Sequence, residues 1–315
     1  METVIEQKTG TAEMLSEVLE VLRQEQKSLP SKYFYDERGS NLFEEICELD
    51  EYYLTRTELN IMEQNISSMA GAIPDNCKLV ELGSGSSLKT RLLLKALPGL
   101  QAYVPVDISE EFLNSVAENI RSEFPDLTVS PVAADYTKPF QLPESPEDCP
   151  NVAYFPGSTI GNFTREKAEE FMGVIAQIVG EDGSLLIGFD QIKNRQVLLD
   201  AYNDSEGVTA AFNKNILGRL NRDLGADFNL NQFEHKAIYN EEKNRIEMYL
   251  VSTTDQKVII DERELLFRKG ESIHTENSHK YSKKSFRELT QSHFKEVATW
   301  TDDQDYFAIQ LLTRY

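Results

Sequence analysis

Two periodicities of apolar residues follow one another along the chain. Met14, Leu15, Val18 and Leu22 recur at the spacing of an amphipathic helix, which we expect over residues 11–29. Further helical patterns fill residues 40–70. The first 75 residues are therefore predicted to form a helical cap that contains no strand.

From residue 78 onwards, short apolar runs alternate with helical patterns. We expect strands over residues 78–82, 101–106, 127–133, 151–155 and 184–189, and helices over about 88–96, 109–123 and 165–179. This alternation predicts a mostly parallel sheet covered by helices on both faces. The C-terminal ends of its strands then share one edge, which is where such sheets bind ligands.

The alternation stops after Asp190. Residues 193–222 are predicted to be helical, and strand patterns follow at 233–240, 244–253 and 263–267, which together form an inserted unit. A last helix is expected at about 283–293, followed by an antiparallel hairpin that turns at Asp302–Gln304. Five βα units and a terminal hairpin are typical of an α/β Rossmann-like methyltransferase sheet of seven strands, and they differ from the six parallel strands of a nicotinamide-binding domain.

Composition narrows the class of partner. The 315 residues include 53 Asp and Glu against 32 Lys and Arg, a formal net charge of −21. Such a chain repels phosphate backbones and anionic lipids, so neither nucleic acid nor a membrane is expected as a partner. The cysteines form no CxxC pair, the N-terminus lacks a signal-peptide pattern, and no run of 18 apolar residues occurs, so we expect a reduced, cytoplasmic protein. The four histidines lack metal-ligand spacing, so no metal site is expected.

Three consecutive strand ends carry candidate cofactor residues. A glycine turn, Glu81–Ser86, follows the first strand, and Leu88 stands where a dinucleotide fingerprint needs its third glycine. Asp107 ends the second strand, where a carboxylate can accept both ribose hydroxyls of an adenosine. Asp135 and Tyr136 follow the third strand, where they can take the adenine amino group and cover the ring. A helix cap for Asp107 and a plain loop for the other two residues are the alternatives.

Three long motifs resemble one known family. They are VELGSGSSLKTRLLL (80–94), YFYDERGSNLFEEICELDEYYLTR (33–56) and YFPGSTIGNF (154–163). From about residue 28 to 315, the chain is similar to the histidine-specific S-adenosylmethionine-dependent methyltransferases of ergothioneine biosynthesis, which convert L-histidine to the trimethylated betaine hercynine. The resemblance implies a methyltransferase domain over 61–192 and 284–315, and an α+β substrate-binding domain built from 1–60 and 193–283.

The resemblance also implies roles for fourteen residues. The implied cofactor-binding residues are Gly83, Lys89, Asp107, Asp135 and Tyr136. The implied catalytic residues, beside the reacting amine, are Tyr35, Gly157 and Thr159. The implied anchors of the substrate carboxylate are Asn162 and Tyr202. The residues implied to read the imidazole are Tyr52, Glu276 and Ser278, with Met248 lining the side-chain pocket.

Methyl transfer to an amine requires little covalent participation by the protein. Methyl transfer to an amine is an in-line displacement that needs a neutral lone pair held close to the methyl group, so no general base is nominated. Glu276 and Ser278 alternate and so share one face of an extended segment, although solvated strand residues would alternate in the same way.

Two alternative functions remain open. They are a methyltransferase for another amino acid, such as a tryptophan derivative, and a non-catalytic subunit that only binds the cofactor. We expect a monomer that uses S-adenosylmethionine.

Overall fold

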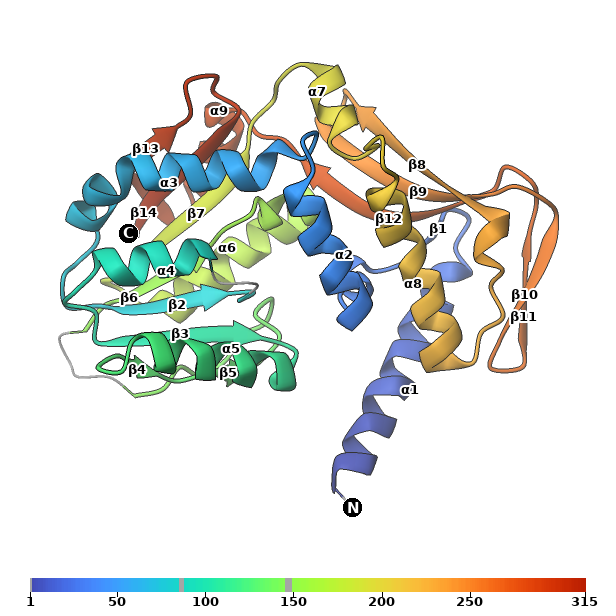
Figure 1. The fold of residues 1–315 in the computed structure, drawn as a ribbon, viewed down its shortest axis with the longest axis horizontal. Helices are drawn as coiled ribbons and strands as arrows, with labels where there is room; N and C mark the ends of the chain where they lie inside the picture. The colour runs from blue at the N-terminus through green and yellow to red at the C-terminus, as the bar shows by residue number, and fades with distance from the viewer. Residues whose placement is uncertain (1, 85–87, 145–148) are drawn as a thin grey trace. The chain divides into compact units, whose positions relative to one another are not determined.

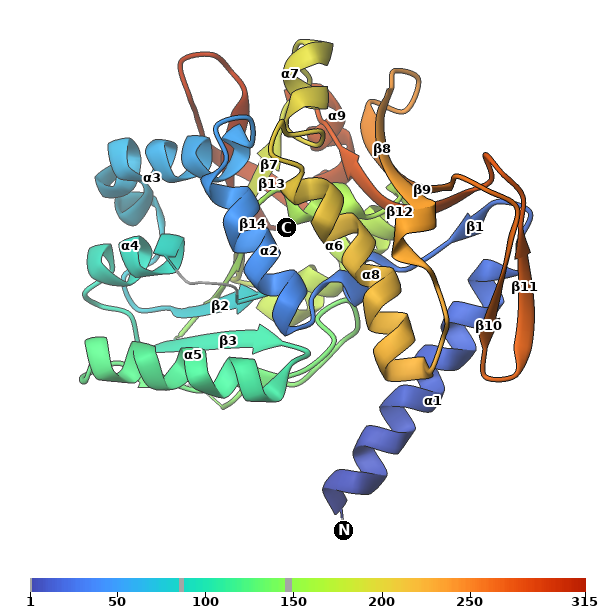
Figure 2. The same cartoon turned by 45° about the vertical axis from the view of Figure 1, so that its right-hand side comes forward.

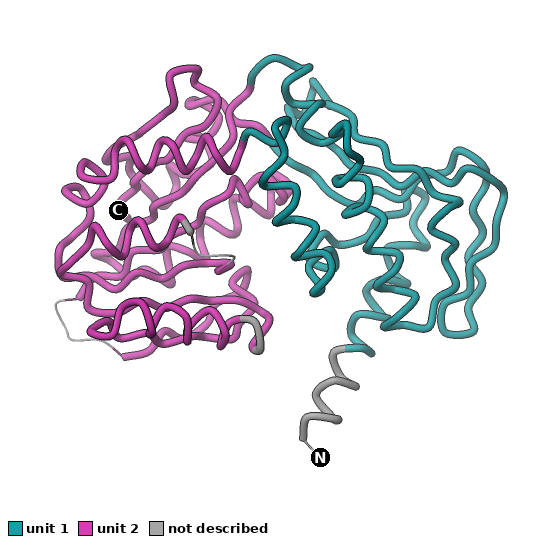
Figure 3. The backbone as a smooth tube through the Cα atoms, viewed as in Figure 1, with its two compact units in different colours: residues 1–53, 193–279 teal, residues 54–192, 280–315 magenta. Residues whose placement is uncertain are grey.

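The chain folds into two compact units. The computed structural model describes residues 2–84, 88–144 and 149–315, without the side chains of residues 2–10, 88, 111 and 112. Unit 1 comprises Met1–Tyr53 and Lys193–His279, and unit 2 comprises Leu54–Ile192 and Lys280–Tyr315 (Figure 3). The sequence places two of these breaks later, at 60/61 and 283/284. The first differs because helix α3 (Tyr53–Ala72) runs unbroken and its apolar face packs into unit 2.

Unit 2 is built on one large sheet (Figure 1). Seven strands follow the order β13-β14-β7-β6-β2-β3-β4, and β5 also pairs with β3. Neighbours from β7 to β4 are parallel, whereas β14 is antiparallel to both β7 and β13. The strands are β2 (Lys78–Leu82), β3 (Ala102–Asp107), β4 (Thr128–Val129), β5 (Val132–Ala133), β6 (Asn151–Phe155), β7 (Ser184–Asp190), β13 (Phe294–Thr301) and β14 (Phe307–Arg314). The predicted Rossmann-like α/β fold is confirmed, with the expected third strand split into β4 and β5.

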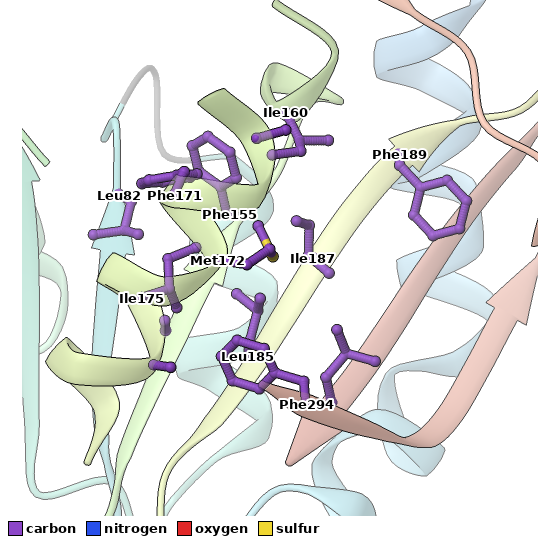
Figure 4. Packing of buried hydrophobic residues seen from close by; sticks show 14 of the residues in the cluster. Leu82, Phe155, Ile160, Phe171, Met172, Ile175, Leu185, Ile187, Phe189 and Phe294 are labelled. Atoms are coloured by element: carbon purple, nitrogen blue, oxygen red, sulfur yellow. The ribbon is translucent and has the colours of Figure 1, made fainter. Parts of the chain in front are cut away.

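Helices cover both faces of this sheet because successive strand residues point to opposite sides. Tyr103 of β3 packs with α3, α4 and α5, whereas Val104 packs with α6 and α9 on the other side. On that second side, Phe171 and Met172 of α6 pack against Ile187 of β7 (Figure 4). The remaining helices of unit 2 are α4 (Leu88–Ala96), α5 (Glu110–Glu123), the short 3-10 helix η2 (Thr159–Asn162), α6 (Arg165–Val179) and α9 (Lys283–Thr290).

Unit 1 has its own four-stranded sheet, in the order β1-β12-β9-β8, and a separate hairpin, β10-β11. Helix α8 packs against α2, η1 and the strands β8 and β9, and α2 and α8 lie side by side in both views of Figures 1 and 2. The strands are β1 (Lys27–Ser28), β8 (Phe233–Asn240), β9 (Arg245–Ser252), β10 (Gln256–Ile260), β11 (Arg263–Phe267) and β12 (Ser272–His279). The helices are α1 (Glu2–Leu22), η1 (Ser31–Phe34), α2 (Glu37–Glu48), α7 (Arg195–Asp200), α8 (Val208–Leu224) and η3 (Leu230–Gln232).

Three predictions for this unit were wrong. The first helix ends at Leu22, not at residue 29, and Lys27–Ser28 forms a strand parallel to β12 in a region predicted to have none. The helix predicted over 193–222 is broken at residues 201–207, because Asp204 accepts hydrogen bonds from the first backbone N–H groups of α8 and Gly207 is left-handed. Within the described part of the chain, no helix is long and apolar enough to cross a bilayer.

Candidate active site

The turn after β2 brings the chain close to the end of β3. Gly83 has φ +77°, and its N–H donates to the Val106 carbonyl at 2.9 Å. A Cβ at this position would stand 3.5 Å from the Tyr136 ring, so glycine keeps the backbone open to a ligand beside that ring. Gly85 and Ser86 of the predicted turn lie outside the described residues.

Asp107 and Tyr136 lie at the same sheet edge. The Asp107 carboxylate ends β3, and burial raises its pKa although the Ser109 and Ile108 N–H groups partly offset this. A half-buried carboxylate of this kind gains from hydroxyl donors such as those of a ribose. Tyr136 packs edge-on to Phe155, and burial, together with the Asp107 charge, raises the pKa of its phenol. The structure therefore brings Gly83, Asp107 and Tyr136 together, as predicted.

The Asp135 carboxylate forms its hydrogen bonds and its ion pair with residues of its own turn. Its Oδ1 accepts from the Thr137 N–H at 3.1 Å and from the Thr137 hydroxyl at 2.5 Å, and Lys138 lies 3.1 Å from Oδ2. Burial acts to raise the pKa of Asp135, but the bonds from Thr137 and Lys138 outweigh it and lower that pKa. Its role toward adenine stays a prediction.

Ser84 supplies an independent sign of a ligand. Its hydroxyl is fully buried in the glycine turn and has no hydrogen-bond partner among the residues that the structure describes. A buried hydroxyl without a partner is destabilising, so such groups at a site are usually satisfied by a bound molecule or water. Together with the open backbone at Gly83, this unpaired Ser84 hydroxyl is compatible with a bound adenosyl cofactor. No cluster of three or more metal-ligating side chains occurs in the described part of the chain.

Lys89 pairs with a carboxylate that the sequence analysis did not predict to belong to the site. Its ammonium group on α4 forms an ion pair with Glu58 of α3, which is completely buried. Both Glu58 oxygens also accept from the Gly157 N–H, at 2.9 and 3.1 Å. No motif or spacing pointed to Glu58, since its partners lie 31 and 99 residues further along the chain.

The turn after β6 is held in an unusual backbone conformation. Gly157 has φ +78° and Ser158 has φ +57°, and the Ser158 hydroxyl accepts from the Asp190 N–H at 2.9 Å. The Thr159 hydroxyl donates to the Pro156 carbonyl at 2.9 Å. Ile160 is buried in the core against α6 (Figure 4), which anchors η2 and its last residue, Asn162. Three predicted residues, Gly157, Thr159 and Asn162, therefore share one rigid turn.

A cluster of aromatic residues in unit 1 contains three further predicted residues, Tyr35, Tyr52 and Tyr202. Tyr52 and Tyr202 are both buried, with ring centroids 6.1 Å apart, and Phe43 lies between Tyr52 and Tyr35. Burial raises the pKa of Tyr52 well above its usual value, so its phenol stays neutral. The Tyr202 hydroxyl donates to the Ser278 hydroxyl at 2.7 Å. Tyr35 is 44% exposed at the end of η1.

The strand pair β9-β12 presents Met248, Glu276 and Ser278 on one face. Glu276 pairs directly with Met248, and Ser278 pairs with Ile246. Residues i and i+2 of a strand share a face, so the predicted alternation of Glu276 and Ser278 agrees with this register. A register shift between His274 and Glu276 makes a bulge at Thr275, and this bulge determines which side chains face Met248.

A polar network ties this bulge to Tyr202, and the sequence did not predict it. His235 Nε2 donates to the Tyr202 carbonyl, and its Nδ1 accepts from the Asn213 amide, each at 2.8 Å. The Asn213 amide also donates to the Tyr249 carbonyl at 3.0 Å and accepts from the Thr275 hydroxyl at 2.7 Å. The network thus connects the predicted carboxylate anchor to the strand that carries Glu276.

The fold and the strand-end residues define the class of protein, which is an S-adenosylmethionine-dependent methyltransferase. The sheet order is that of such enzymes, and the glycine turn, Asp107 and Tyr136 lie where the strands end. The chain belongs to the family of histidine-specific, S-adenosylmethionine-dependent methyltransferases, whose model matches residues 14–314. The predicted family, enzyme class and cofactor are confirmed.

Similar proteins cover most of the chain. It is 39% identical over 294 residues to a histidine N-alpha-methyltransferase of Mycolicibacterium smegmatis, with 91% of each chain covered. It is 37% identical over 311 residues to a histidine N-alpha-methyltransferase of Mycobacterium tuberculosis, with 97% of this chain and 96% of the relative covered. It is 30% identical to ergothioneine biosynthesis protein 1 of Neurospora crassa, over 89% of this chain and 32% of that protein.

Proposed function

We propose that the protein transfers three methyl groups from S-adenosylmethionine to the α-amino group of L-histidine, which gives hercynine, an intermediate of ergothioneine synthesis. The observation that carries this proposal is the arrangement in unit 1 of the buried residues Tyr202, Ser278 and Met248 with the half-buried Glu276. It combines two hydroxyls and a carboxylate with one apolar wall. A ring with two nitrogens satisfies such a surface, whereas an indole or a phenyl ring leaves polar atoms unpaired.

The cofactor is assigned to unit 2. Asp107 would accept the ribose hydroxyls, Tyr136 would cover the adenine, and Lys89 would face the carboxylate of the methionine part. Bound there, the cofactor supplies an electrophilic sulfonium methyl group. The residues of the protein bind and orient, because a near-attack arrangement of amine and methyl group is most of what this displacement requires.

The substrate would be held by groups that methylation does not alter. Asn162 and Tyr202 are assigned to the carboxylate, and Glu276 and Ser278 to the imidazole. Tyr202 can serve its role only if its hydroxyl hydrogen turns toward the substrate, and the Ser278 hydroxyl can then donate to the Tyr202 oxygen in exchange. The amine loses its N–H donors over three cycles, so recognition has to rest on these other groups. Gly157, Thr159 and Tyr35 are proposed to lie beside the amine.

We also propose that the enzyme works as a monomer in the cytoplasm. The support is the strongly acidic composition, which favours a dispersed protein, and the three cysteines, Cys47, Cys77 and Cys149, none of which forms a disulfide in the described part of the chain. Light scattering during gel filtration should give the mass of one chain.

The decisive experiment offers the protein S-adenosylmethionine with each of the twenty amino acids and follows product mass. We expect histidine to gain one, two and then three methyl groups, with the other amino acids unchanged. Equal methylation of tryptophan would reassign the substrate. Cofactor binding without methylation of any amino acid would instead favour a non-catalytic subunit.

A further inference from the structure

Glu58 carries a fully enclosed carboxylate at the candidate site. Its side chain is 1% exposed, and it forms its ion pair with Lys89 of α4. Both of its oxygens accept from the backbone N–H of Gly157, at 2.9 and 3.1 Å. One carboxylate on α3 thus joins α4 and the turn after β6.

The neighbouring strand is shaped to admit this carboxylate. Gly188 lies in the middle of β7, and a Cβ there would come within 2.2 Å of Glu58 Oε1 and 3.0 Å of the Phe307 ring. Glycine weakens a strand interior, so it is expected where another group comes very close. The space that any larger side chain would fill at position 188 is occupied by Glu58.

The energetics of buried ion pairs indicate that the Lys89–Glu58 pair has a role beyond stabilising the fold. A buried ion pair gains little over a well-packed apolar pair, because desolvation offsets most of the Coulomb attraction. An ammonium group, however, has three N–H donors. Lys89 can therefore keep Glu58 and still present donors to an anionic group of a ligand.

We infer that Glu58 is a positioning residue that holds Lys89 and the Gly157 turn in one fixed arrangement, so that the cofactor and the amine-binding turn are set by the same carboxylate. This inference rests on the proposed function, because it takes Lys89 as a cofactor residue and Gly157 as part of the turn beside the amine. Glu58 itself need touch neither substrate nor cofactor.

The test is a double-mutant cycle between Glu58→Gln and Lys89→Met. Glutamine keeps an oxygen for the Gly157 N–H but loses the charge that orients Lys89. Affinity for S-adenosylhomocysteine, measured by calorimetry, should fall about tenfold in each single variant, and the double variant should fall little further, since residues that share one interaction are not additive. The kcat for histidine at saturating cofactor should also fall about tenfold, with the KM for histidine within about twofold.

The control is Glu169→Gln, which removes an exposed ion pair with Arg165 in the same unit and should leave every quantity unchanged.

Strictly additive losses in the cycle, or a kcat for Glu58→Gln equal to that of wild type, would overturn the inference. If Glu58→Gln fails to fold, Lys89→Met decides the question alone, and a kcat equal to that of wild type at saturating cofactor would then overturn the inference. A residue that only binds cofactor would change the cofactor KM, whereas a coupled residue also lowers kcat at saturation. The binding cycle needs no amino acid, so its outcome is separable from the proposed substrate.

Discussion

Asp107 and Glu276 illustrate, at the residue scale, two different uses of a carboxylate. Asp107 is half-buried at a strand end, and its raised pKa reflects burial that nearby backbone donors only partly offset. Glu276 projects from a strand face beside Met248, where its charge lies close enough to raise the pKa of Tyr52. Each carboxylate can therefore be tested by truncation, with a control variant in the same unit.

Truncation of Asp107 should weaken cofactor binding. The variant Asp107→Ala removes the charged acceptor proposed for the ribose, so the free energy of S-adenosylhomocysteine binding should become less favourable by about 1.5–3 kcal/mol. Calorimetry measures this directly. Asp126→Ala, an exposed aspartate in the same unit, serves as the control and should bind as wild type does. Unchanged affinity in Asp107→Ala would remove that residue from the site.

Truncation of Glu276 should change which ring the enzyme accepts. The variant Glu276→Ala should cost about 2–4 kcal/mol in kcat/KM for histidine, because it removes the half-buried charged partner proposed for the imidazole. The loss for tryptophan should be much smaller, and shortening Met248 as well should help larger rings further. The measured quantity is the histidine-to-tryptophan ratio of kcat/KM.

The neighbouring residue provides the control for this change. Asn277 pairs with Glu247, which places it on the opposite face of β12, so Asn277→Ala should leave the ratio near that of wild type. If the ratio in Glu276→Ala moves by no more than about twofold, which is below ~0.5 kcal/mol, Glu276 does not read the ring.

At the scale of secondary-structure elements, the bulge in β12 and the break between α7 and α8 together place residues that we propose to bind the substrate. His235 connects them, since it bonds to the Tyr202 carbonyl in the break and, through Asn213, to Thr275 in the bulge. Burial lowers the pKa of His235, and both ring nitrogens are engaged in the neutral form. A proton on Nδ1 would face the Asn213 amide as donor against donor, and that amide is fixed by its two other bonds.

The lowered pKa of His235 predicts a dependence of stability on pH. The unfolded chain takes up a proton near pH ~6.5, whereas the folded chain resists it, so folding stability should fall as the pH drops below that value. In His235→Gln this contribution is absent, and the loss of unfolding free energy between about pH 7.5 and about pH 5.5 should be smaller than in wild type. Urea unfolding at both pH values measures it. Equal losses in the two proteins would show that His235 is not held neutral.

At the scale of the whole molecule, the predicted residues are divided between the two units. The predicted cofactor residues and the Gly157–Asn162 turn belong to unit 2, whereas Tyr202 and the residues predicted to contact the imidazole belong to unit 1. The two proposed carboxylate anchors, Asn162 and Tyr202, therefore come from different units.

Both proposed carboxylate anchors should contribute to substrate binding. Asn162→Ala and Tyr202→Phe should each raise the KM for histidine, by about tenfold to a hundredfold for a lost hydrogen bond to a charged group, and should leave cofactor affinity unchanged. Histamine, which lacks the carboxylate, should be a poor substrate of the wild type and should be little affected by either substitution. Efficient methylation of histamine by the wild type would contradict the assignment of these two residues.

The sequence by itself determined the large sheet and most of its helices. The apolar runs at 78–82, 151–155 and 233–240 and the helical pattern at 165–179 became β2, β6, β8 and α6 with the predicted bounds. These elements follow from local periodicity and burial, which a short window of residues expresses. The sequence also placed Gly83, Asp107 and Tyr136 at one edge of the sheet, since the ends of parallel strands share one side of it.

Tertiary structure alone decided the features that depend on distant partners. The two residues of β1 form a strand only because β12 lies beside them, and the bulge at Thr275 exists only in the pairing with β9. Glu58 reads as an ordinary helix residue, and it becomes part of the site only when folding brings it to Lys89 and Gly157. The physical reason is common to all three. Hydrogen bonds and ion pairs between groups far apart in the chain leave no periodic trace in the amino acids that make them.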